Sequence, residues 1–182
     1  KRKGWYLGEN MYLWLAAFLY MLFISLISLI AVLPTVSTNR LWGEIAGDFV
    51  VNQRSLIPVY TWGLVMPVRV IQNYYPLAAF MYTFITGWLS IVFIGKLMYL
   101  LNLKIGKKTI GISAAVFFIM LDPVAVYFTN FKQYGLLYVS PINWSSLENI
   151  NTVSGYPHLS GEYMFITYII LIGVESLLSY IC

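Results

Sequence analysis

Two acidic residues, Glu44 and Asp48, stand four positions apart in the sequence RLWGEIAGDF. On a helix this spacing places both carboxylates on one face. Carboxylate oxygens bind divalent cations, and one carboxyl of such a pair can also accept a proton from a reacting hydroxyl. The alternative is a solvated turn beside a membrane that carries two ordinary acids. The spacing alone leaves both interpretations open.

Two basic residues, Arg69 and Lys132, are candidates for binding a phosphate group. Arg69 lies in the sequence MPVRVIQN, where a guanidinium at a membrane surface can hold phosphate oxygens through two parallel hydrogen bonds. Lys132 follows an apolar segment and can meet the phosphate of a lipid. The alternatives are an interfacial anchor for Arg69 and an ordinary surface lysine for Lys132.

Three charged residues lie within or near the ends of apolar segments. Asp122 precedes Pro123, and this pair predicts either a functional carboxylate or an interruption of the helix at the interface. Glu175 is deeper in its segment, where it is expected to pair with a Lys or Arg of a neighbouring helix or subunit, or to take part in proton handling. Lys96 is near the end of its segment and is expected to extend its ammonium to the membrane surface.

The composition identifies the class of protein in which these residues act. Of the 182 residues, 60% are hydrophobic and 10% are charged, whereas soluble domains carry about 25% charged residues. The chain is therefore expected to be an integral membrane protein. The net charge of +4 comes without basic runs interleaved with aromatic residues, so nucleic acid is not an expected partner. One cysteine and one histidine exclude a Cys/His zinc site and a bis-histidine haem site.

The hydropathy pattern predicts an all-α polytopic membrane protein. The first apolar segment, Met11–Leu33, has no charged residue and is long enough to cross a hydrocarbon core of about 30 Å. A thirteen-residue apolar stretch that contains two prolines is too short to cross and predicts an interfacial or re-entrant helix over 56–68. The whole chain is expected to form one membrane domain, with spans at 11–33, 77–101, 110–128 and 163–182 and outer loops at 34–76 and 129–162.

The distribution of basic residues predicts the orientation. With the N-terminus on the cytoplasmic or matrix side, the inner side of the membrane carries most of the Lys and Arg, as the positive-inside rule requires. The host membrane is expected to be the plasma membrane or the mitochondrial inner membrane.

In this orientation the sequence Asn143-Trp144-Ser145 matches a glycosylation motif on the outer side. Because the chain begins without Met and stops in an apolar segment, we expect a processed, split or partial protein. The basic residues on the inner side are Lys1, Arg2, Lys3, Lys96, Lys104, Lys107 and Lys108.

Several short motifs follow one another in a recognisable order. The acidic segment Leu41-Trp42-Gly43-Glu44-Ile45-Ala46 comes after the first span, and Ile57-Pro58-Val59-Tyr60 comes next. The basic turn Gly106-Lys107-Lys108 follows, and then Pro123, Tyr127-Phe128 and Gln133-Tyr134. Over roughly residues 11 to 137 this order resembles the N-terminal membrane region of the GT-C glycosyltransferases, which use polyprenyl-phosphate-linked sugars. The chain departs from the family pattern at Ile45, where a second acid is usual, and at Ile57, where a proline is usual.

The resemblance implies a role for each candidate residue. Glu44 would hold a divalent metal or accept a proton from the acceptor hydroxyl, and Asp48 would assist it. Arg69 or Lys132 would neutralise the phosphate that leaves from the donor. The predicted function is that of a membrane glycosyltransferase-like protein acting on a lipid-linked sugar at the outer face. The alternative is a non-catalytic membrane subunit of a large assembly, such as a respiratory or ATP-synthase complex, surrounded by lipids and other subunits.

Overall fold

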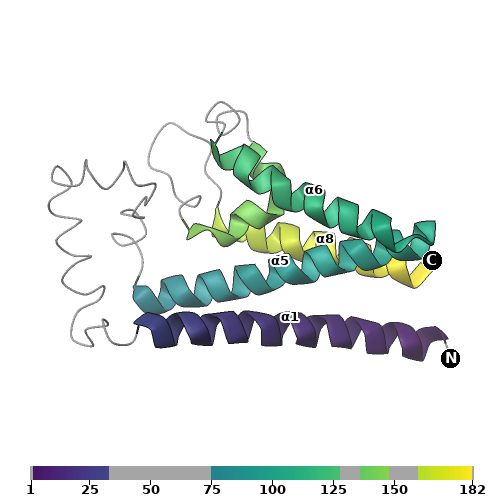
Figure 1. The fold of residues 1–182 in the computed structure, drawn as a ribbon, viewed down its shortest axis with the longest axis horizontal. Coiled ribbons are helices and arrows are strands. Elements are labelled where there is room, and N and C mark those ends of the chain that lie inside the picture. The colour runs from purple at the N-terminus through teal and green to yellow at the C-terminus, as the bar shows by residue number, and fades with distance from the viewer. Residues whose placement is uncertain (1, 33–74, 128–135, 148–159, 182) are drawn as a thin grey trace, which may run out of the picture.

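The fold is a bundle of four long helices (Figure 1). A computed structural model describes residues 2–32, 75–127, 136–147 and 160–181, and no strand occurs in these ranges. The predicted all-α class is therefore confirmed. The long helices are α1 (Arg2–Val32), α5 (Pro76–Ile105), α6 (Lys108–Tyr127) and α8 (Gly161–Ile181), and two short 3₁₀ helices are η3 (Leu136–Val139) and η4 (Pro141–Ser145).

Three of the described helices are long and apolar enough to cross a membrane. The qualifying segments are Gly4–Ile30 of α1, Pro76–Ile105 of α5 and Gly161–Ile181 of α8. Helix α6 has 20 residues, which is about 30 Å of helix, although its uninterrupted apolar part is the shorter segment Thr109–Leu121. These helices support an integral membrane protein. The interfacial helix predicted over 56–68 lies outside the described residues.

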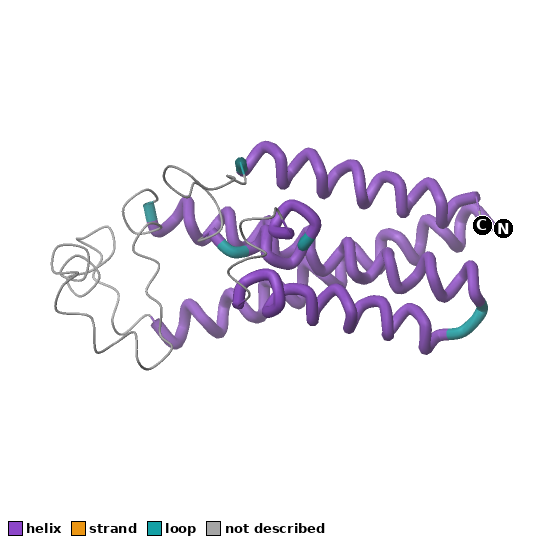
Figure 2. The backbone as a smooth tube through the Cα atoms, turned by 90° about the horizontal axis from the view of Figure 1, so that it is seen from above, coloured by secondary structure: helices purple, strands orange, loops and turns teal. Residues whose placement is uncertain are grey.

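The four long helices alternate in direction. Both chain termini and the connection from α5 to α6 lie at one end of the bundle (Figures 1 and 2). Helix α5 occupies the centre, because it contacts α1, α6, α8 and η4. Every other long helix therefore has its position set mainly by its contact with α5.

The turn between α5 and α6 depends on two glycines. Gly106 has a φ of 71° and its N–H donates to the carbonyl of Asn102 at 2.9 Å, a left-handed helix end that glycine adopts without a steric penalty. Gly111 lies against α5 and donates its N–H to Oδ1 of Asn102 at 3.2 Å. A Cβ on Gly111 would come within 2.7 Å of the Met98 carbonyl oxygen. The absence of a side chain therefore allows the two helices to approach closely.

Aromatic side chains join α1 to α5. The rings of Trp14 and Trp88 meet edge to face, with centroids 5.3 Å apart, and Nε1 of Trp88 donates to the carbonyl of Trp14 at 3.2 Å. Phe18 packs on Trp88 with centroids 5.5 Å apart. Lipid tails are as apolar as these side chains, so close packing and interhelical hydrogen bonds, rather than burial from water, hold such helices together.

The segment with η3 and η4 packs into the bundle. The sequence predicts an outer loop over 129–162, and within the described residues 136–147 the helix η4 lies against α5, α6 and α8 while η3 lies against η4. Trp144 is only 1% exposed, and its ring meets that of Tyr168 at 5.0 Å. Asn143 is also 1% exposed, and its Nδ2 donates to Oγ of Ser140 at 2.9 Å. The amide of the predicted glycosylation motif thus points into the protein in this fold.

The Asp122-Pro123 pair does not interrupt α6. The backbone stays helical through both residues and ends at Tyr127. A proline inside a helix removes one backbone hydrogen bond, and neighbouring helices in a membrane protein compensate for that loss. The predicted interruption of this span is therefore wrong for the backbone.

Candidate functional site

The four residues predicted to act on a substrate lie outside the described residues. Glu44, Asp48 and Arg69 belong to the segment 33–74, and Lys132 belongs to the segment 128–135. The described helices that flank these segments are the C-terminal ends of α1 and α6 and the N-terminal end of α5. All three ends lie at the end of the bundle opposite the chain termini (Figure 1).

The described helices bring a different set of charged groups together, at the contact between α5 and α8. Lys96 is 5% exposed and Glu175 is 6% exposed. The ammonium of Lys96 donates a hydrogen bond to the hydroxyl of Ser176. That hydroxyl donates in turn to the carbonyl of Ile172 at 2.6 Å. A polar connection therefore crosses the α5–α8 interface inside an apolar bundle.

Lys96 and Glu175 lie on the two helices of this interface, and both are buried. A single charge within a membrane is costly, and pairing is the usual way in which that cost is reduced. The ammonium of Lys96 is bonded to Ser176, so the pairing of Glu175 with a Lys or Arg stays a prediction. The surface position predicted for Lys96 is wrong, because its ammonium has an acceptor inside the bundle. Oε2 of Glu175 has no hydrogen-bond partner in the part of the chain that the structure describes.

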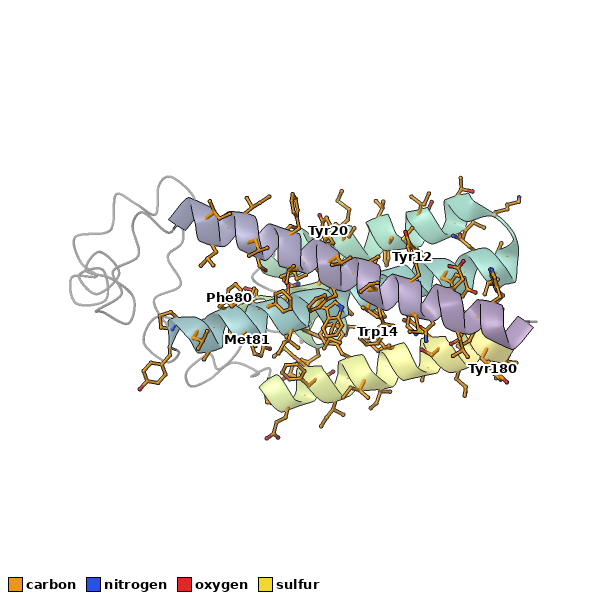
Figure 3. The ribbon with its side chains drawn as sticks, turned by 90° about the horizontal axis from the view of Figure 1, so that it is seen from below. Tyr12, Trp14, Tyr20, Phe80, Met81 and Tyr180 are labelled. Carbon is orange, nitrogen blue, oxygen red and sulfur yellow. The ribbon has the colours of Figure 1, made fainter. Side chains whose placement is uncertain are left out.

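Tyrosine side chains join α1 to α8 at the end of the bundle that holds the chain termini (Figure 1). The hydroxyl of Tyr6 on α1 donates to the carbonyl of Ser176 at 2.7 Å, and the ring of Tyr6 meets that of Tyr180 with centroids 5.7 Å apart. Figure 3 shows Tyr180 at the end of α8 beside the first turns of α1. The hydroxyl of Tyr99 is buried and has no partner among residues 2–32, 75–127, 136–147 and 160–181. Helices α1, α5 and α8 therefore meet here through polar groups.

A cavity of about 430 Å³ opens between α1 and the α5–α8 pair. This volume lies within the range of small-molecule sites, about 300–1,000 Å³. The cavity was not predicted from the sequence. The lining residues of α1 recur three or four positions apart, a spacing that places side chains on one helix face, so this face could have been recognised. The cavity is lined by Tyr6, Glu9, Asn10, Tyr12, Leu13, Ala16, Ala17 and Tyr20 of α1, Ile91, Gly95, Lys96 and Tyr99 of α5, and Ser179 of α8.

A second buried polar group lies toward the other end of the bundle. The hydroxyls of Ser90 on α5 and Tyr168 on α8 are 2.5 Å apart, and the Tyr168 hydroxyl also donates to the carbonyl of Pro141. Tyr168 is fully buried. These hydrogen bonds join α5, α8 and η4. Because the hydroxyls bond to groups within the protein, the cluster has a structural role.

The described residues do not form a metal site of the usual kind, because no three His, Cys, Asp or Glu side chains come together in them. The predicted metal ligand Glu44 lies outside these residues. No protein-family model, curated protein or solved structure matches the chain. The function is therefore argued from the residues and their geometry.

Proposed function

We propose that the chain is a membrane glycosyltransferase-like protein that acts on a lipid-linked sugar at the outer face of the membrane. The observation that supports this proposal is the common position of three helix ends. The ends of α1 and α6 and the start of α5 lie at one end of the bundle, and the segments that carry Glu44, Asp48, Arg69 and Lys132 connect to these ends. Residues tethered in this way can meet at one membrane surface.

The proposed reaction transfers the sugar from a phosphate to a hydroxyl. The oxygen of the acceptor attacks the anomeric carbon while the bond from that carbon to the donor phosphate breaks. The phosphate leaves with the electron pair, and Arg69 and Lys132 stabilise its negative charge. Glu44 accepts the proton of the acceptor hydroxyl, and Asp48 assists it. No step of this proposal passes through a metal ion.

The orientation belongs to the same proposal. The N-terminus and the α5–α6 turn lie on the cytoplasmic or matrix side, where the basic residues gather, as the positive-inside rule requires. The opposite end of the bundle then faces outward, in the plasma membrane or the mitochondrial inner membrane. A polyprenyl-phosphate sugar presented at the outer surface would reach the tethered segments without crossing the bilayer.

The test is sugar transfer by the purified full chain in liposomes that contain polyprenyl-phosphate-linked radiolabelled hexoses or pentoses. Glu44→Gln should abolish transfer while the protein keeps its elution volume and helix content. Glu162→Gln, a change of the same kind at an exposed residue of α8, should leave transfer unchanged. Arg69→Gln should raise the KM for the donor. Transfer that persists in Glu44→Gln would remove Glu44 from the mechanism.

The alternative function, a non-catalytic subunit of a large membrane assembly, is supported by α1. Only 11% of the membrane-crossing window of α1 is buried inside the bundle, so most of this helix is available to lipid or to another subunit. The measurement that distinguishes the two functions is the mass of the particle extracted in mild detergent. A stoichiometric complex with defined partners, without transferase activity, favours the subunit.

A further inference from the structure

The end of the bundle that holds the chain termini carries exposed positive charge. Lys104 lies in the last turn of α5, Lys107 follows it in the connection to α6, and both residues are exposed. The acidic residues described at this end are Glu9, which is half-buried, and Glu175, which is buried. At the opposite end of the bundle (Figure 1), the exposed charged residue that the structure describes is the acidic Glu162. The exposed charges described at the two ends therefore have opposite signs.

The length of α5 places these lysines at the level of the lipid headgroups. Its 30 residues span about 45 Å at 1.5 Å per residue. The hydrocarbon core is about 30 Å thick, and the bilayer with its headgroup layers is about 40–45 Å thick. The helix therefore reaches from one headgroup layer to the other, and Lys104 is one residue from its end. Trp5 of α1, at the same end, is 54% exposed, as is typical of a residue at the membrane interface.

The turn between α5 and α6 keeps the two lysines close to each other. Gly106 lies between them, and its φ of 71° ends α5. Three residues of chain span at most about 11 Å even when they are fully extended. A lysine carries its ammonium on a flexible stem of four carbons, so the ammonium groups of Lys104 and Lys107 can both reach one phosphate.

We infer that Lys104 and Lys107 bind the phosphate of one anionic phospholipid in the leaflet on the side of the chain termini. Both ammonium groups donate hydrogen bonds to the phosphate oxygens. A zwitterionic headgroup is a weaker ligand, because its own ammonium repels the two lysines. Leu103 and Ile105, both exposed beside the lysines, offer apolar contact to the first carbons of the acyl chains. This site lies at the end of the bundle opposite the surface proposed for sugar transfer, and it does not depend on that proposal.

The experiment is native mass spectrometry of the full chain, titrated with phosphatidylglycerol and phosphatidylethanolamine of identical acyl chains. One lysine near an anionic lipid surface strengthens binding by about fivefold, so Lys104→Gln and Lys107→Gln should each weaken only phosphatidylglycerol by about this factor. The double variant should lose the preference for phosphatidylglycerol. Lys104→Arg should keep the preference, because the charge remains. Glu162→Gln, at an exposed position of the opposite end, should change neither affinity.

Three results would overturn the inference. Equal binding of the two lipids by the unaltered chain would show that the headgroup charge is not recognised. A preference that persists in the Lys104→Gln/Lys107→Gln double variant would place the lipid elsewhere. Competition by glycerol 3-phosphate at the same concentration as phosphatidylglycerol would make the ligand a free phosphate rather than a lipid. The two substituted positions are exposed, so unchanged melting temperatures are expected for these variants.

Discussion

The ammonium of Lys96 on α5 donates a hydrogen bond to the hydroxyl of Ser176 on α8. The two residues are 80 positions apart in the sequence, so this contact joins two membrane helices rather than neighbouring turns. Glu175, the residue before Ser176, is buried as well. Taking the ammonium of a lysine out of water is costly, and the Ser176 acceptor offsets part of that cost.

Lys96→Met should destabilise the bundle, because it removes the hydrogen bond from the ammonium to Ser176 across the α5–α8 interface. We expect a loss of about 1–2 kcal/mol in the free energy of unfolding, the contribution of an interhelical hydrogen bond in a membrane. The measurement is unfolding of the purified protein in mixed micelles with increasing fractions of a denaturing detergent. The double variant Lys96→Met/Ser176→Ala should lose less stability than the sum of the two single changes, because both remove the same hydrogen bond. A double variant as unstable as that sum would show that the two side chains do not interact.

Gly111→Ala should weaken the α5–α6 contact. Its new Cβ would lie within 2.7 Å of the Met98 carbonyl oxygen, and overpacking of this kind costs about 1–3 kcal/mol. Gly173→Ala is the matched control, since no atom lies within 4 Å of a Cβ placed at that position of α8. Thermal unfolding of the two variants should therefore separate them. Equal melting temperatures would contradict the close approach of α5 and α6.

Tyr168→Phe should destabilise the protein more than Tyr163→Phe. The Tyr168 hydroxyl is buried and contacts both Ser90 and the Pro141 carbonyl, whereas the Tyr163 hydroxyl is exposed and donates only to the Tyr138 carbonyl among the described contacts. Interhelical hydrogen bonds in membranes contribute about 0.6–2 kcal/mol, so we expect a loss of about 1 kcal/mol for Tyr168→Phe. Detergent titration of the two variants measures the difference. An equal effect of both changes would contradict the buried position of Tyr168.

Single cysteines placed at Lys107 and Ser160 should react with a membrane-impermeant maleimide from opposite sides of the membrane. Both positions are exposed, and they lie at opposite ends of the bundle. The variants are made in a Cys182→Ser background, which removes the only native thiol. Gly4→Cys should react from the same side as Lys107→Cys. Labelling of positions 107 and 160 from one side would contradict the arrangement of α8 across the bilayer.

The helices were predictable from the sequence because long apolar segments leave few alternatives in a membrane. An uncharged segment such as Met11–Leu33 must satisfy its backbone groups internally, and a helix does this. The packing of 136–147 was not predictable, because its apolar residues alternate with Ser and Asn in no helical or strand period. Burial does not follow residue type there, since Ser140 and Asn143 are buried while Val139 is exposed. The hydrogen bond between Asn143 and Ser140 cannot be inferred from sequence spacing.

The site was only partly predictable. A carboxylate at membrane depth, such as Glu175, is costly without a partner. The sequence therefore predicted that a Lys or Arg side chain pairs with it. Which residues of α5 face it depends on how α5 and α8 are rotated about their axes, and Val92 and Met164, both fully buried, belong to the core between the helices. The cavity that Glu9 lines is formed by residues of three helices, α1, α5 and α8. No local pattern contains that information.

The distance in sequence between Lys96 and its acceptor has a consequence during synthesis. At about 5–20 residues per second, roughly 4–16 s pass between the translation of Lys96 and that of Ser176, 80 positions later. Until α8 has been made, the ammonium of Lys96 lacks its Ser176 acceptor, and a lysine at such a depth can extend its ammonium toward the membrane surface. The synthesis of α8 therefore supplies the internal acceptor that holds this side chain within the bundle.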